Sequence, residues 1–217
     1  MDFLTRVIGI LACVLATGSV AQTGGYPSKP MRLIVPFGAG GGNDVVGRVL
    51  AARLAQTFGQ PFIVENRPGN NGFIGVKLVV DAAPDGHTIL IGPSGPIAIS
   101  PAIFSKMPYS PLKDLAPVTM IGSYPLILVV SQSLPARSIA ELVQYAKARP
   151  DKVNYGSTAA TFQLASELFN LKSGTKFEHI PYKSSADFTT AVMTGEITIA
   201  FADPIPAIGL VKSGKIR

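Results

Sequence analysis

A run of glycines directly after a strand-like segment is the feature of this sequence best suited to chemistry. Residues 38–42 are Gly-Ala-Gly-Gly-Gly, they follow the apolar run 33–35, and Asn43 or Asp44 can cap the helix that comes next. Such a turn gathers free backbone N–H groups around one small volume, and the helix dipole adds partial positive charge there. The turn can therefore bind an anion without a side-chain cation. On spacing alone, a tight turn with no ligand explains the same residues equally well.

A second loop repeats this arrangement later in the chain. Residues 155–161 run from a strand-like segment through small hydroxyl residues into a helix start, and they include Ser157, Thr158 and Thr161. Ordinary helix capping by these hydroxyls is the alternative interpretation. Ligands of α/β proteins bind beyond the carboxyl ends of strands, where such loops lie. Two loops of this kind, one on each of two lobes, favour a ligand site in the cleft between them.

The sequence matches the known nucleotide-binding and hydrolase motifs only poorly. The glycine run is not followed by Gly-Lys-Ser/Thr, so it is not a phosphate-binding P-loop. A dinucleotide fingerprint counted from Gly38 has Asn43 in the third glycine position. Residues 92–96 resemble a nucleophile elbow around Ser94 but lack its final glycine. A serine hydrolase that uses Ser94 therefore stays as a less favoured alternative.

Histidines and acidic residues give no sign of metal or acid–base catalysis. His87 follows Asp85-Gly86 and is expected to be a solvated turn residue, whereas His179 lies in a strand-like segment and is expected to be a satisfied sheet residue. The sequence has no HExxH motif, no paired cysteines and no clustered carboxylates. We therefore expect no catalytic residue, no metal site and no cofactor.

The segments that must position the two loops alternate between strand and helix. Strand-like runs at 33–35, 62–64 and 89–91 are separated by helical patterns at 45–58 and 72–81, which predicts a parallel sheet covered by helices. The apolar runs 118–121 and 126–130 have no helix between them, and we interpret them as the crossover to a second lobe. That lobe is expected to hold helices near 138–148, 162–171, 186–194 and 205–211, and strands near 153–156, 179–182 and 197–201.

Composition and the N-terminal residues indicate an exported protein. Hydrophobic residues make up 47% and charged residues 15% of the 217, which is too apolar for a disordered chain. A short apolar run at 7–16 ends before the small residues 19–21, which predicts a signal peptide cleaved after Ala21 with Cys13 inside its core. The net charge of +6 comes from scattered Lys and Arg without interleaved aromatics, so no nucleic-acid partner is expected.

Several motifs together resemble one known family. They are Pro-Phe-x-x-Gly-Gly-x-x-Asp at 36–44, Glu-Asn-Arg-Pro-Gly at 65–69, Pro-Asp-Gly-His-Thr at 84–88, Met-Pro-Tyr at 107–109, Lys-Asp-Leu-Ala-Pro-Val at 113–118, His-Ile-Pro-Tyr-Lys at 179–183 and Gly-Lys-Ile-Arg at 214–217. The set is similar to the substrate-binding proteins of tripartite tricarboxylate transporters, also called Bug receptors, from about residue 29 to the end.

The resemblance implies a two-lobe α/β fold of the type II periplasmic-binding-protein class and no catalysis. The lobes would span residues 26–122 and 123–214, and a small organic acid would be held between them largely by backbone amides. The contacts that the resemblance implies are Phe37, Ala39, Gly40, Asp44, Ser94, Gly95, Ser157, Thr158, Thr161 and Asp203. The implied partners are the membrane subunits of the transporter, and the receptor itself would be a periplasmic monomer.

The family's chains continue well beyond residue 217 and cross back to their first lobe. The sequence stops just where another strand is expected, so we expect the first lobe to be incomplete. A truncated remnant of such a receptor that no longer binds its ligand is therefore the alternative to a functional receptor.

Overall fold

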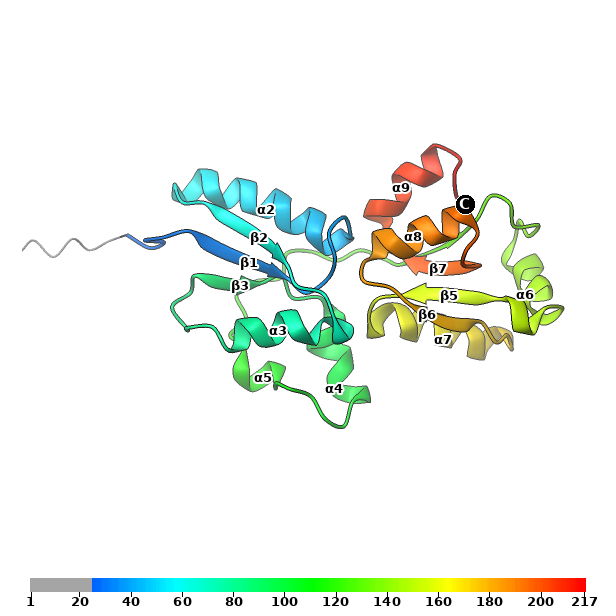
Figure 1. The fold of residues 1–217 in the computed structure, drawn as a ribbon, viewed down its shortest axis with the longest axis horizontal. Helices are drawn as coiled ribbons and strands as arrows, with labels where there is room; N and C mark the ends of the chain where they lie inside the picture. The colour runs from blue at the N-terminus through cyan, green and yellow to red at the C-terminus, as the bar shows by residue number, and fades with distance from the viewer. Residues whose placement is uncertain (1–24) are drawn as a thin grey trace, which may run out of the picture.

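The protein folds into two α/β lobes that lie end to end, as a computed structural model of residues 25–217 shows (Figure 1). The described chain begins at the outer end of the first lobe and finishes on the second. The predicted signal peptide and Cys13 lie outside the described residues. The two-lobe α/β fold predicted from the sequence is confirmed.

The first lobe is built on a three-stranded parallel sheet with the order β2-β1-β3. The central strand is the predicted apolar run: Leu33, Ile34 and Val35 have no exposed surface. Helices α2 and α3 cover opposite faces of this sheet (Figure 1). The bounds are β1 Met31–Val35, α2 Gly42–Phe58, β2 Phe62–Asn66, the 3-10 turn η2 Asn70–Gly72, α3 Phe73–Val80 and β3 Thr88–Leu90.

Helix α3 packs closely against the backbone at the start of the glycine turn and limits its conformation. A Cβ atom at Gly75 would lie 2.7 Å from the Cα of Pro36 and 2.8 Å from the carbonyl oxygen of Arg67. Only a residue without a side chain allows α3 to pack this near to the backbone that leaves β1. The conformation of the turn is thereby tied to the packing of the lobe.

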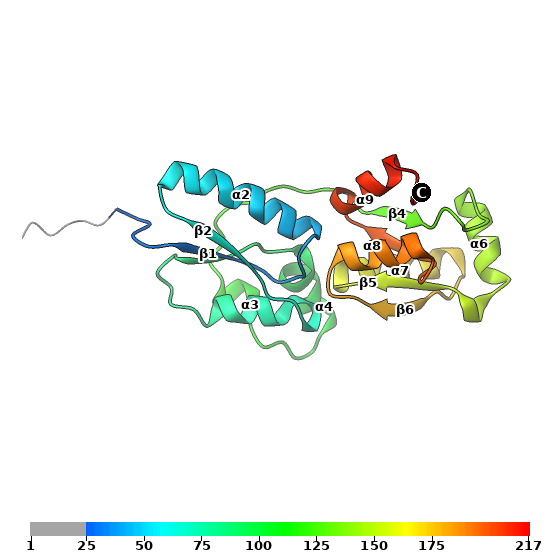
Figure 2. The ribbon, with the colours of Figure 1, turned by 45° about the horizontal axis from the view of Figure 1, so that its top comes forward.

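Short elements and a long connection follow β3. They are a π-helical turn η3 Gly95–Ile99, α4 Ser100–Ile103 and α5 Pro111–Asp114. The apolar run 118–121 forms no regular element, and Val118 and Met120 are each 83% exposed. This stretch therefore serves as an extended link between the lobes, which Figure 2 shows crossing from one to the other.

The second lobe has a four-stranded sheet with the order β4-β7-β5-β6. Strand β4 pairs antiparallel with β7, and the other pairs are parallel. The bounds are β4 Ile127–Val130, α6 Ile139–Lys147, η4 Pro150–Lys152, β5 Asn154–Ser157, α7 Ala160–Ser173, β6 Glu178–Pro181, α8 Ser185–Thr194, β7 Ile199–Ala202 and α9 Pro204–Lys212. Helices α7 and α8 both pack on β5 and β7, from opposite sides of the sheet (Figure 1). Val130 and Arg217 exchange both backbone hydrogen bonds, and Ser131 and Ile216 form an isolated antiparallel bridge beside β4.

Two helices of the second lobe begin at serine N-cap residues. Ser138 caps α6 by accepting a hydrogen bond from the Glu141 amide, but the Glu141 side chain bonds to Arg137 N–H instead of closing a capping box. A complete capping box stands at α8, where Ser184 and Asp187 each accept from the other's backbone N–H. This box fixes the chain direction just before α8.

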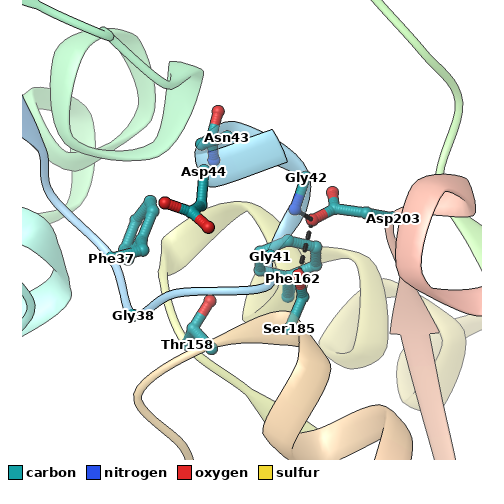
Figure 3. Close-up of a pocket in the computed structure, with 10 residues that line it drawn as sticks. All are labelled: Phe37, Gly38, Gly41, Gly42, Asn43, Asp44, Thr158, Phe162, Ser185 and Asp203. Atoms are coloured by element: carbon teal, nitrogen blue, oxygen red, sulfur yellow. Dashed lines mark hydrogen bonds between the residues drawn. The ribbon is translucent and has the colours of Figure 1, made fainter. Parts of the chain in front are cut away.

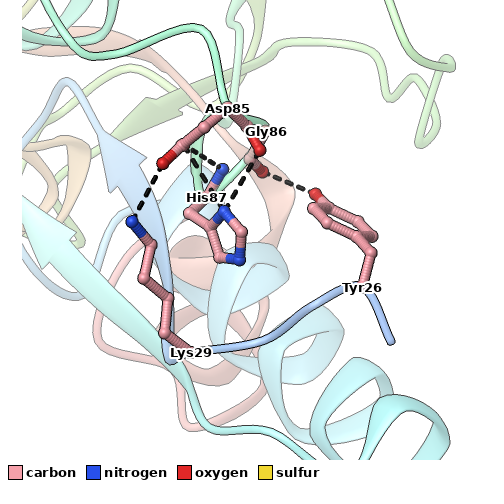
Figure 4. A network of polar contacts seen from close by, with 5 residues as sticks. All are labelled: Tyr26, Lys29, Asp85, Gly86 and His87. Atoms are coloured by element: carbon pink, nitrogen blue, oxygen red, sulfur yellow. Dashed lines mark hydrogen bonds and ion pairs between the residues drawn. The ribbon is translucent and has the colours of Figure 1, made fainter. Parts of the chain in front are cut away.

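His87 is buried, contrary to the expectation of a solvated turn residue. Its Nδ1 lies 3.1 Å from the carbonyl oxygen of Asp85, and its ring meets the Tyr26 ring edge-on (Figure 4). Tyr26 donates a hydrogen bond to the carbonyl oxygen of Gly86, and Lys29 pairs with the Asp85 carboxylate. These contacts attach the segment before β1 to the turn before β3, so the motif at 84–88 has a structural role.

We expect acid to weaken the first lobe through Glu65. Hydrogen bonds from Arg32 and Arg67 lower the pKa of Glu65 from 4.5 to about 2. Because the folded pKa is depressed, this stabilisation is fully present above pH 4.5 and is lost as the pH falls toward 2. The arginine side chains are 40% and 50% exposed, so we expect the effect to be only about 1 kcal/mol. Urea unfolding of the wild type and Glu65→Gln at pH 7 and pH 3 would measure it, and an equal pH dependence in both proteins would contradict the assignment.

Candidate functional site

The glycine turn forms the wall of the first lobe that faces the second lobe. Helix α2 begins at Gly42 with Gly41 as its N-cap residue, and no side chain of its own caps it. Asn43 and Asp44, predicted as caps, lie instead inside the first helical turn. The first amides of α2 are therefore free to meet a group from outside the helix.

Asp44 is buried beneath this turn and holds it in shape. Its carboxylate accepts hydrogen bonds from the Gly40 amide at 2.9 Å and from Asn66 Nδ2 at 2.9 Å, and it pairs with Arg48 at 3.0 Å. Burial alone would raise the pKa of Asp44, but these donors outweigh it and the pKa is lowered. An ionised carboxylate with its lone pairs occupied suits a structural role better than direct contact with an anionic ligand.

The turn packs against the N-terminal end of α8 in the second lobe. The Gly38 amide donates to the carbonyl oxygen of Lys183 at 3.0 Å. A Cβ at Gly40 would lie 3.3 Å from Cβ of Ala186, and one at Gly41 would lie 3.0 Å from Oγ of Ser185. This contact was not predicted from the sequence; the Ser-Ser-Ala-Asp pattern of a capping box at 184–187 could have located the start of α8 but not its approach to the glycine turn.

Asp203 joins the two lobes at the same place. Its Oδ2 accepts a hydrogen bond from Ser185 Oγ at 2.7 Å and another from the Gly42 amide at 3.2 Å (Figure 3). The residue is only 2% exposed. The sequence-predicted contact at Asp203 thus lies beside the predicted glycine turn.

Between the lobes is a cavity of about 10 Å³, which is room for about one water molecule. It is lined by Phe37, Gly38, Gly41, Gly42, Asn43, Asp44, Thr158, Phe162, Ser185 and Asp203. This lining holds two carboxylates but no lysine or arginine. A small acid would have to be held by amides and hydroxyls, and the lobes would have to separate to admit it.

The residues of the second predicted loop have two different roles. Thr158 lines the cavity, as expected for a ligand contact. Ser157 is 2% exposed, and its Oγ lies 2.7 Å from Nε2 of His179. Burial lowers the pKa of His179, which favours its neutral form and a satisfied role in the sheet, as predicted. Helix α7 takes Ala159 as its N-cap residue without a side-chain cap, so the hydroxyls here do not serve as helix caps.

Ser94, Gly95 and Thr161 form a separate contact between the lobes. Ser94 Oγ lies 3.3 Å from Thr161 Oγ1, and a Cβ at Gly95 would lie 3.1 Å from the same oxygen. These residues border the closed lobes but do not line the small cavity. Ala39 and Gly40 are exposed on the glycine turn and also lie outside the lining.

The hydrogen bonds leave Ser94 without the partner that a serine nucleophile needs. Its hydroxyl meets Thr161, whereas His87 bonds to Asp85 and His179 bonds to Ser157. Among residues 25–217, no group of three side chains is placed to hold a metal ion. Over the same residues, none of the helices combines the length and apolar character that crossing a bilayer requires.

Comparison with known proteins gives one consistent result. Residues 46–217 match the tripartite tricarboxylate transporter family receptor. The chain is similar to protein BugT of Bordetella pertussis, with 35% identity over 99% of this chain and 68% of the relative. Its fold is similar to that of Rpa4515 of R. palustris with adipate, with a TM-score of 0.85 and 35% identity over 88% of this chain and 65% of that one.

A second solved structure is similar at lower identity. It is MatC from Rhodopseudomonas palustris with bound malate, with a TM-score of 0.81 and 27% identity over 88% of this chain and 66% of that one. The chain spans about two thirds of the length of these relatives.

Proposed function

This chain belongs to the tripartite tricarboxylate transporter receptor family, and from that premise we propose that it is a solute-binding protein for a small organic carboxylate. The observation that carries the proposal is the meeting of two strand-to-helix loops, one from each lobe, at a single buried polar cavity. The solved relatives that hold adipate and malate support the carboxylate class.

The ligand is held largely by backbone groups. The start of α2 and Thr158 line the cavity; the Gly42 amide, which bonds to Asp203 Oδ2 in this structure, is one donor for the ligand, and the helix dipole favours negative charge there. Phe37 and Phe162 supply an apolar wall for the carbon chain of the acid. Ser94, Gly95 and Thr161 would contact the longer end of the ligand when the lobes are apart, with Ala39 and Gly40 on the opposite rim.

The biological setting that we propose is the one the family resemblance implies. The receptor acts in the periplasm as a monomer and delivers its ligand to the membrane subunits of a tripartite transporter. It performs no catalysis and uses no metal or cofactor.

Ligand class is tested most directly by calorimetric titration of the purified chain. The panel is malate, adipate, other mono- and dicarboxylates, an amino acid, a neutral sugar and divalent metal ions. We expect a carboxylate to bind best, and at one hundred times its Kd to stabilise the fold by about 2.7 kcal/mol in thermal unfolding. Preference for the sugar or for a cation would overturn the carboxylate assignment, and a folded chain that binds nothing in the panel would favour the remnant alternative.

A further inference from the structure

The side chain of Asp203 turns away from its own helix. Asp203 is the N-cap residue of α9, yet it makes no side-chain cap to that helix. Both of its hydrogen bonds, from Ser185 Oγ and from the Gly42 amide, converge on the single atom Oδ2. A residue in a capping position thus serves a different helix, in the other lobe.

The helix that Asp203 reaches is the one that lacks a cap. Gly41, the N-cap residue of α2, has no side chain, and the Gly42 amide is one of the orphan donors at the helix start. Asp203 satisfies it across the boundary between the lobes. An aspartate at a helix N-terminus is also favoured by the helix dipole.

Tyr124, from the segment that links the lobes, lies close to the same carboxylate. A Cβ at Gly42 would lie 2.9 Å from both Asp203 Oδ2 and the hydroxyl of Tyr124, which belongs to that link. Burial, together with the adjacent Asp203 carboxylate, raises the pKa of Tyr124, so its hydroxyl keeps its proton and can face the negative charge. The first lobe, the second lobe and the link therefore converge on one side chain.

Asp203 is held as a ligand carboxylate would be held. None of the ion pairs formed by the described residues includes it. Its charge is stabilised instead by a backbone N–H at a helix N-terminus and by a hydroxyl donor, inside the cavity that closes between the lobes. An incoming acid would need this same amide.

Resting on the proposed function, we propose that Asp203 is an internal carboxylate that latches the lobes together without ligand and yields the α2 amide to the ligand's carboxylate. It is a positioning residue that sets the balance between the closed, empty receptor and the open one. It also selects ligands, because only an acid that replaces its hydrogen bonds can occupy the start of α2.

The latch is tested first without any ligand, by energy transfer between dyes on Gln56→Cys and Lys172→Cys in a Cys13→Ser background. Asp203→Ala removes the acceptor, and Gly42→Ala places a methyl group 2.9 Å from Asp203 Oδ2 without changing charge. We expect both to raise the ratio of open to closed molecules by about 2- to 30-fold, the range that loss of a helix cap covers. Asp203→Asn keeps an acceptor oxygen but loses the charge that the helix dipole favours, so its ratio should lie between those of the wild type and Asp203→Ala.

Asp151→Ala is the matched control, because Asp151 is an exposed aspartate of the same lobe. Circular dichroism of each variant confirms that it is folded. Open fractions of Asp203→Ala and Gly42→Ala that both equal the fraction of Asp151→Ala would overturn the latch.

The second arm measures binding of malate and adipate by titration and stopped flow. Asp203→Asn should bind the preferred acid more tightly than the wild type, because a neutral amide competes less well for the helix dipole. Equal or weaker binding would overturn the proposal that Asp203 competes with the ligand for the α2 amide. If no acid binds any variant while the energy-transfer shifts remain, the proposed function fails and the latch stands.

Discussion

Replacement of Gly40 by valine is expected to abolish ligand binding in a chain that still folds. Gly40 has a φ of +80°, a backbone conformation that is strained for a β-branched residue. A Cβ there would lie 3.3 Å from Cβ of Ala186, so the two methyl groups of valine would hold the glycine turn away from α8. Without closure the ligand loses the second-lobe contacts, and we expect the Kd measured by titration to rise at least about a hundredfold.

The control variant Gly59→Val distinguishes the effect of backbone strain from the effect of lost contact between the lobes. Gly59 has a φ of +68° at the C-terminal end of α2, and a Cβ there meets nothing within 4 Å. Both variants should lose stability from the left-handed backbone, by roughly 1–3 kcal/mol in urea unfolding. Only Gly40→Val should lose binding; unchanged affinity in folded Gly40→Val would mean that the turn has a structural role alone.

The elements of the fold could be predicted because they follow from local patterns. The apolar run of β1 and the helical spacing of α2, which ends at Phe58 just before Gly59, are visible in the sequence and were confirmed. The run 118–121, interpreted from the sequence as part of the crossover, lies in the link between the lobes and pairs with no strand among the described residues. Apolar character alone does not show whether a neighbouring strand is available.

The site was harder to predict because it depends on contacts between distant segments. Phe37, Asp44, Thr158 and Asp203 do line the cavity, but Ser185 was missed. Its role arises from the approach of α8 to the glycine turn, which no local pattern encodes. Ser157 was named as a ligand contact, yet its hydroxyl bonds to His179, which is adjacent only after β5 and β6 pair. The ligand contacts themselves stay predictions, and the structure shows which of the named residues line the cavity.

Hydrogen exchange is expected to show much weaker protection in the first lobe than in the second. In the first lobe only β1 has neighbours on both sides, and neither β2 nor β3 contains a fully buried residue. An open hollow of about 450 Å³ also lies beside Phe62 and Val64, between α2 and β2. In the second lobe, β5 and β7 are both internal strands and most of their residues are buried.

The size of the difference follows from the apolar surface that the first lobe leaves uncovered. Val49 on α2 and Ile63 on β2 are 62% and 49% exposed. Burial of apolar surface stabilises by roughly 25 cal/mol per Å², so about 100 Å² less buried surface lowers the opening free energy by about 2.5 kcal/mol. Amides of β1 should therefore exchange about 30- to 100-fold faster than those of β7, after correction for intrinsic rates. Measurement at two pH values establishes that exchange reports the population of open states. Equal protection of β1 and β7 would contradict the prediction and show that the first lobe is stable by itself.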